Sequence, residues 1–111
     1  MRVAVCKDEE NTELFLTKSE YRNNGRIYLG FECYDGDSGY NNYQPYGDLT
    51  INLSDFMIED DNIIFINSYV SDSIIEQLED IGLLTQLDVV QYNMGRYRKC
   101  YLFTKTMENF L

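Results

Sequence analysis

Apolar and polar side chains alternate along residues 27–34, where every second position from Ile27 to Cys33 is apolar. A period of two is typical of a β-strand that buries one face. A short, continuous apolar run, such as the one from Ile63 to Ile66, indicates a strand that is buried on both faces. Further strands are predicted at residues 2–6, 12–22 and 49–53.

Clusters of asparagine and glycine mark two hairpin turns. Residues 23–25 (Asn-Asn-Gly) tolerate the positive φ that a tight turn between antiparallel strands requires. A last hairpin is predicted from residues 89–92 and 97–104, joined by Asn93-Met94-Gly95. A long loop is predicted from Asp35 to Gly47, because this segment is rich in Gly and Asn and carries the one proline of the chain.

One amphipathic helix is predicted after Ser71, whose hydroxyl can accept a hydrogen bond from an amide of the first helical turn. The helix is expected to end near Ile81, because Gly82 suits a left-handed stop. Strands outnumber helices and do not alternate with them, which favours an α+β fold. We expect a mostly antiparallel sheet of about six strands and one main amphipathic helix, in a single acidic domain over residues 1–111.

Composition narrows the classes of function. The net charge is −10, from 19 acidic and 9 basic residues, which argues against nucleic acid or an anionic membrane as the direct partner. No apolar run reaches the roughly 18 residues of a membrane helix. Acidic residues begin at Asp8, which argues against a signal peptide. A cytoplasmic protein is therefore expected.

The chain offers few groups for catalysis or for binding a metal. It has no histidine, and its cysteines, Cys6, Cys33 and Cys100, are not paired at metal-binding spacing. Each lies in an apolar run, so three reduced, buried thiols are expected. We predict no enzyme, no catalytic residue, no metal site and no cofactor. A glycosidase-like pair of carboxylates stays open, because the sequence does not show which acids face each other across a cleft.

The placement of charge is the most informative feature of the sequence. Residues 1–26 hold five bases and five acids, residues 27–95 hold thirteen acids and no base, and residues 96–111 hold four bases and one acid. Soluble surfaces normally intersperse both signs, because like charges repel each other. On the predicted helix the acids Asp72, Glu76, Glu79 and Asp80 fall within about 100° of arc, opposite an apolar stripe. A second acidic cluster is Glu59, Asp60 and Asp61.

Two interpretations of these acids stay open. They can form a solvated face that keeps the protein soluble, or a surface that competes with nucleic-acid phosphates for a basic groove. Helical residues four apart rise by about 6 Å, whereas successive phosphates on one DNA strand rise by about 3.4 Å. Such mimicry would therefore act through the electrostatic field and not through matched atomic positions.

Tyrosines and a basic run add two candidate features. Tyr40, Tyr43 and Tyr46 lie in the predicted loop, where they offer either rigid contact area to a partner or plain packing. The run Arg96, Arg98 and Lys99 is expected to pair with the protein's own acids, since the chain has few bases.

The order of several short motifs indicates a family resemblance. Asn24-Gly25-Arg26 is followed by an alternating strand, then by residues 47–53 (Gly-Asp-Leu-Thr-Ile-Asn-Leu), a helix ending at residues 79–83 and a closing strand with Tyr101-Leu102-Phe103. This order resembles a family of small uncharacterised proteins carried by conjugative elements, plasmids and phages of Gram-positive bacteria. The resemblance spans about residues 20–105. The chain departs from it in its longer tyrosine loop and in lacking a segment with glycine and proline before the last strand.

The resemblance implies an accessory gene of mobile DNA, whose product is expected in the cytoplasm of a bacterial host cell. Some small acidic proteins from such elements are anti-CRISPR inhibitors of type II effectors, which hold guide RNA and target in positively charged channels. We therefore expect a non-enzymatic inhibitor that blocks guide RNA loading or assembly of a type II CRISPR effector nuclease. Its alternatives are an antirestriction-type DNA mimic and a structural or regulatory protein-binding module of a conjugation system. The expected contact residues are Glu59, Asp60, Asp61, Asp72, Glu76, Glu79, Asp80, Tyr40, Tyr43 and Tyr46.

Overall fold

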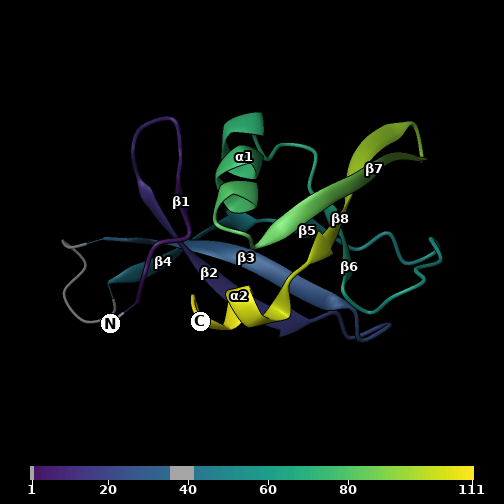
Figure 1. The fold of residues 1–111 in the computed structure, drawn as a ribbon, viewed down its shortest axis with the longest axis horizontal. Helices are drawn as coiled ribbons and strands as arrows, with labels where there is room; N and C mark the ends of the chain where they lie inside the picture. Colours follow the sequence, from purple (N-terminus) through teal and green to yellow (C-terminus); the bar gives the residue numbers. More distant parts are fainter. Residues whose placement is uncertain (1, 36–41) are drawn as a thin grey trace.

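The segments with a period of two pair into antiparallel sheets (Figure 1). The computed structural model describes residues 2–35 and 42–111, and over these ranges the fold is α+β, with eight strands and two short helices. The strands form two four-stranded sheets, in the orders β1-β2-β3-β4 and β5-β6-β8-β7. The expected α+β class and antiparallel pairing are confirmed. The prediction of one sheet of about six strands with one main helix is matched only roughly, because the described strands form two sheets and a second short helix is present.

The first sheet is built around the predicted hairpin at residues 23–25. Its strands are β1 (Cys6–Lys7), β2 (Glu13–Glu20), β3 (Ile27–Tyr34) and β4 (Tyr43–Asp48). Gly25 has φ +72°, as the turn chemistry requires, and Glu20 pairs with Ile27 beside it. The alternation over residues 27–34 thus corresponds to a central strand of this sheet.

The second sheet is built around the C-terminal hairpin. Its strands are β5 (Thr50–Ile51), β6 (Ile63–Ile66), β7 (Leu84–Tyr92) and β8 (Gly95–Leu102). Asn93 and Met94 both have positive φ, 45° and 67°, which is the backbone of a two-residue type I′ turn. This turn fixes the pairing of Tyr92 with Gly95. In Figure 1 the end of this hairpin projects away from the body of the protein.

Both sheets contribute to one hydrophobic core. Helix α1 (Asp72–Asp80) packs into it through Ile74, Ile75 and Leu78, which are buried, and α2 (Thr104–Glu108) packs through Met107. A smaller cluster around Leu53, Ile63 and Phe65 lies on the other face of the second sheet. Among the described residues no helix is long and apolar enough to cross a bilayer.

The predicted helix signals are confirmed. The Ser71 hydroxyl accepts a hydrogen bond from the amide of Ile74 at 3.3 Å, and Gly82 has φ +75°. The Leu83 amide donates to the Leu78 carbonyl, which completes a Schellman-type end. Ile81, near which the helix was expected to end, is its C-cap residue and is 39% exposed.

Ser71→Ala is expected to lower the free energy of unfolding by about 1 kcal/mol, because one amide of the first turn loses its acceptor. Urea denaturation followed by circular dichroism measures the change. The exposed Ser54 is the matched control, and Ser54→Ala is expected to change stability by less than about 0.5 kcal/mol. Equal effects of the two substitutions would show that the cap contributes nothing.

Several predicted boundaries are wrong. The strand predicted at residues 2–6 is only β1 at Cys6–Lys7, and the strand at 49–53 is only β5. The predicted loop from Asp35 to Gly47 ends early, because β4 begins at Tyr43. β4 was missed because it is a mostly exposed edge strand without an apolar alternation, and Pro45 is tolerated at an edge. α2 was missed because no side chain caps its start.

Candidate partner-binding surface

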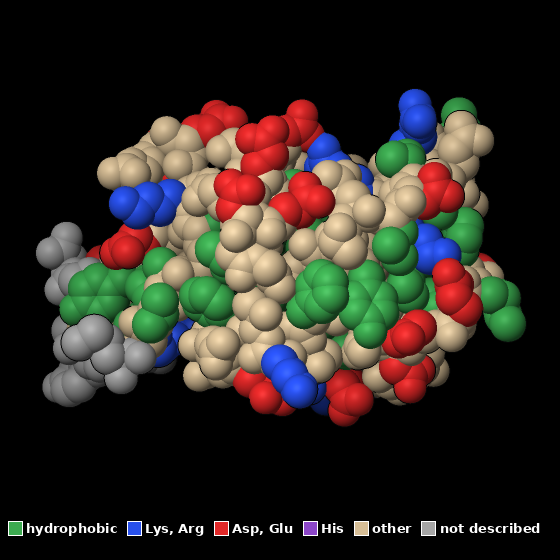
Figure 2. All heavy atoms as spheres, in the orientation of Figure 1, with side chains coloured by type: hydrophobic (Ala, Val, Ile, Leu, Met, Phe, Trp, Pro, Cys, Tyr) green, Lys and Arg blue, Asp and Glu red, His purple; other side chains and the backbone are tan. Residues whose placement is uncertain are grey.

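The two predicted acidic clusters lie in different parts of the molecule. Asp72, Glu76, Glu79 and Asp80 belong to α1, whereas Glu59, Asp60 and Asp61 lie in the loop between β5 and β6, at one end of the molecule in Figure 1. Asp72 pairs with Arg98 and Glu59 pairs with Lys99, and these consecutive residues of β8 point to opposite faces of the second sheet. The two clusters therefore do not form one continuous face. Figure 2 shows acidic side chains gathered over α1.

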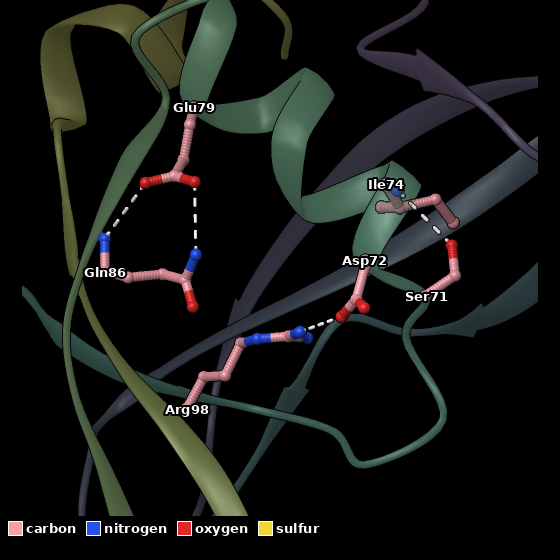
Figure 3. A network of polar contacts seen from close by, with 6 residues as sticks. All are labelled: Ser71, Asp72, Ile74, Glu79, Gln86 and Arg98. Atoms are coloured by element: carbon pink, nitrogen blue, oxygen red, sulfur yellow. Dashed lines mark hydrogen bonds and ion pairs between the residues drawn. The ribbon is translucent and has the colours of Figure 1, made fainter.

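Half of the α1 acids are engaged within the protein (Figure 3). Asp72 forms an ion pair with the Arg98 guanidinium of β8. Glu79 accepts hydrogen bonds from the backbone amide of Gln86 at 3.4 Å and from its side-chain amide at 3.1 Å. Glu76 and Asp80 have no polar partner among the described residues and are exposed. The charge that α1 can offer to another molecule is thus concentrated at these two positions.

The basic run pairs with the protein's own acids, as predicted, at two of its three positions. Arg98 pairs with Asp72, and Lys99 donates to Glu59 at 2.8 Å. The hydrogen bond from Lys99 also holds the pKa of Glu59 below its usual value. Arg96 has no ion-pair partner within residues 2–35 and 42–111. Both pairs join exposed carboxylates, which the solvent screens, so neither pair contributes much to the stability of the fold.

The remaining members of the Glu59–Asp61 cluster differ from each other. Asp60 accepts a hydrogen bond from the Asn62 amide at 2.8 Å, so it stabilises the turn that leads into β6. Asp61 is exposed and has no polar partner in the described part of the chain.

The three tyrosines that were predicted to share a loop have different surroundings. Tyr40 lies outside the described residues. Tyr43 lies on β4, half-buried, where it packs edge-on against Phe15 at 5.1 Å and lies beneath the guanidinium of Arg2 at 4.3 Å. Much of its ring is therefore used for packing within the protein. Tyr46 is 45% exposed and remains available to another molecule.

Tyr46 helps to line a hollow of about 450 Å³ between the β1–β2 turn, the end of β4 and the start of α1. We call it the acidic hollow, because four carboxylates and two tyrosines contribute to its lining. These residues are Asp8, Glu9, Glu10, Asp48, Tyr46 and Tyr69. Of these six residues, only Tyr46 is among the contact residues that were predicted from the sequence.

Hydrogen bonds hold two of these carboxylates in place. Asp8 accepts from the Thr12 amide at 2.9 Å and from the Tyr46 hydroxyl at 2.8 Å, and these bonds hold the pKa of Asp8 below its ordinary value. Donation to Asp8 raises the pKa of Tyr46 to about 12. Asp48 accepts a hydrogen bond from the Tyr28 hydroxyl at 2.6 Å. Burial is the larger cause, and this hydrogen bond the next, that raises the pKa of Tyr28 to about 12. Asp8 therefore stays ionised at neutral pH.

Tyr69 is the most exposed aromatic residue in this region. It lies in the segment between β6 and α1 and is 74% exposed. A second hollow, of about 550 Å³, shares Tyr69 with the acidic hollow and is also lined by Arg96 and Arg98. Tyr69 therefore forms a ridge between an acidic hollow and one that carries basic side chains.

Sequence reasoning missed the acidic hollow because its parts are far apart in the chain. The run Asp8-Glu9-Glu10 lies within residues 1–26, where five bases balance five acids, so this segment shows no excess of charge. Tyr69 stands alone between Ser68 and Val70 and belongs to no motif. The local density of acids at residues 8–10 was the one available signal.

The cysteines are free thiols, and two of the three are buried as expected. Burial raises the pKa of Cys6 and of Cys100 to about 12, so both are protonated at neutral pH. Cys33 is only half-buried, which corrects the prediction of three buried thiols, because the end of β3 is covered less completely than its centre. Over residues 2–35 and 42–111 no three acidic or cysteine side chains are placed to hold a metal ion.

No protein-family model, curated protein sequence or solved structure matches this chain.

Proposed function

We propose that this protein is a non-enzymatic inhibitor that binds a basic, nucleic-acid-binding surface of another protein. One observation carries the proposal: residues 27–95 contain thirteen acids and no base. Three of these acids, Glu32, Glu59 and Asp72, form ion pairs with bases from outside the segment, namely Arg2, Lys99 and Arg98. The uncompensated charge produces a negative field that attracts a basic groove and speeds association with it.

The target that we propose is a type II CRISPR effector nuclease. Its channels for guide RNA and target are positively charged, which makes them complementary to the field of this protein. The support for this particular target is the resemblance to proteins of mobile genetic elements over about residues 20–105. On this proposal the protein occupies the channel of the effector before guide RNA does, and thereby blocks loading or assembly.

A cleavage assay with a type II effector tests the proposal by the order of addition. Inhibition is expected when the protein is added before guide RNA and is expected to be weak when it is added afterwards. Raising the salt from about 50 to 300 mM is expected to weaken inhibition, because exposed charges are screened over a shorter distance. The same assay is run in parallel with a restriction endonuclease, which cuts DNA without a guide RNA.

Each outcome of the assay has a defined meaning. Inhibition of the restriction enzyme alone would contradict the CRISPR target and support the antirestriction alternative. No inhibition of either enzyme class, across several effectors, would remove the inhibitor proposal in favour of a conjugation module. Inhibition that is independent of the order of addition would contradict competition with guide RNA.

A further inference from the structure

We infer that the acidic hollow binds an arginine side chain of the basic partner, with the guanidinium between the carboxylates and the two tyrosines. This inference rests on the proposed function for the identity of the partner as a basic protein. It names a contact site that differs from the exposed acids of α1. The hollow of about 450 Å³ lies within the range of about 300–1,000 Å³ that is common for ligand sites.

The charge of the hollow is arranged before a partner arrives. Asp8 and Asp48 are fixed by hydrogen bonds from Tyr46 and Tyr28, so little side-chain entropy is lost when they bind a cation. Glu9 and Glu10 are exposed, and their carboxylates have no partner among the described residues. No basic side chain lines the hollow. Arg96 and Arg98 line the second hollow, on the other side of Tyr69, and Arg98 is paired there with Asp72.

Two aromatic side chains line the same hollow from different elements. Tyr46 comes from β4 and is 45% exposed, and Tyr69 comes from the segment before α1 and is 74% exposed. Tyrosine is enriched among the residues that carry most of the binding energy at protein interfaces. The face of tyrosine attracts cations, and a planar guanidinium both stacks on it and donates to carboxylates in a forked geometry.

The same protein already contains an arginine bound in this way. The Arg2 guanidinium lies 4.3 Å from the centre of the Tyr43 ring and donates to Glu32 at 2.7 Å. Tyr43 and Tyr46 both belong to β4, so one edge strand contributes a tyrosine to each place. Arg2 thus shows that a tyrosine and a carboxylate of this sheet together hold a guanidinium. The acidic hollow offers the same pair of groups without a bound base.

Nuclear magnetic resonance titration of the whole protein with N-acetylarginine amide tests the inference without any nuclease. Backbone amide shifts are expected to concentrate at residues 8–10, 46–48 and 69–71 and to saturate at millimolar probe. N-acetylcitrulline amide has nearly the same shape without the charge and is expected to cause no comparable shifts. Equal shifts with the two probes, or shifts centred on Glu76 and Asp80, would overturn the inference.

Substitutions separate the aromatic and the acidic contributions. Tyr69→Ala is expected to weaken binding of the arginine probe about fivefold, and Tyr69→Phe is expected to retain it, because the ring face is kept. Glu9→Gln with Glu10→Gln is expected to weaken it by a similar factor. The controls are Phe103→Ala, an exposed aromatic residue elsewhere, and Glu20→Gln with Glu108→Gln. Loss of binding in the controls, or none in Tyr69→Ala, would contradict the inference.

The same variants distinguish this inference from the proposed function. If the protein inhibits the nuclease and Tyr69→Ala inhibits as well as the parent, the inference fails and the proposed function stands. If the arginine probe binds as expected but no nuclease is inhibited, the hollow is upheld as an arginine site and the proposed function fails.

Discussion

Leu78→Ala is expected to lower the free energy of unfolding by about 3–5 kcal/mol, the largest effect on stability that we predict. Leu78 is 0% exposed and belongs to the core cluster that α1 shares with both sheets. Removing three carbons there leaves a cavity, because helix and sheets cannot close over it without disturbing each other. A domain of this size is stable by only about 5–15 kcal/mol, so the loss is a large fraction of the total.

Urea denaturation of Leu78→Ala followed by circular dichroism measures this loss. Leu87→Ala is the matched control, because Leu87 lies on β7 and is 51% exposed. Its substitution is expected to change stability by less than about 1 kcal/mol. A loss below about 1 kcal/mol for Leu78→Ala would mean that α1 is not anchored in the shared core.

Glu76→Gln with Asp80→Asn is expected to raise the concentration for half-inhibition of the nuclease about tenfold at low salt. Both side chains are exposed and without a polar partner in the described part of the chain, so their full charge is available to a basic surface. Each exposed charge is worth up to about 1 kcal/mol in such a contact, and two of them account for about one power of ten. This prediction depends on the proposed function.

Glu76→Gln with Asp80→Asn is expected to weaken inhibition without lowering the stability of the fold. Asp80 is the last residue of α1, where the negative end of the helix dipole disfavours a carboxylate. Neutralising it is expected to keep or slightly raise the free energy of unfolding, by about 0.3–1 kcal/mol. A loss of inhibition in this variant could therefore not be attributed to unfolding.

The matched control for the helix variant is Glu20→Gln with Glu108→Gln. It removes the same number of charges from exposed positions outside α1. The control is expected to inhibit nearly as well as the parent, and the difference between the two variants is expected to shrink at high salt. Equal losses of inhibition in the two variants would mean that inhibition depends on the net charge of the protein and not on the position of the acids. Full inhibition by the helix variant would exclude α1 from the contact.

Local features were predictable because they depend on backbone conformation and on hydrogen bonds between close neighbours in sequence. The Ser71 cap bonds an amide three residues ahead, and Gly25 and Gly82 adopt the positive φ that their turns require. β3 and β6 were predictable as well, because burial of one face or of both leaves a periodic or continuous apolar pattern. The sequence by itself thus determined the α+β class, the main helix and the excess of acid.

Only the tertiary structure decided which charged and aromatic side chains are used in contacts within the protein and which remain exposed. β4 carries no apolar pattern because it lies at an edge. Its place beside β3 half-buries Tyr43 against Phe15 and leaves Tyr46 exposed. Arg98 and Lys99 neutralise acids that lie 26 and 40 positions away in the sequence. The acidic hollow likewise joins residues 8–10, 46–48 and 69–74. Contacts over such separations follow from the packing of the two sheets, which leaves no mark in any single segment of the chain.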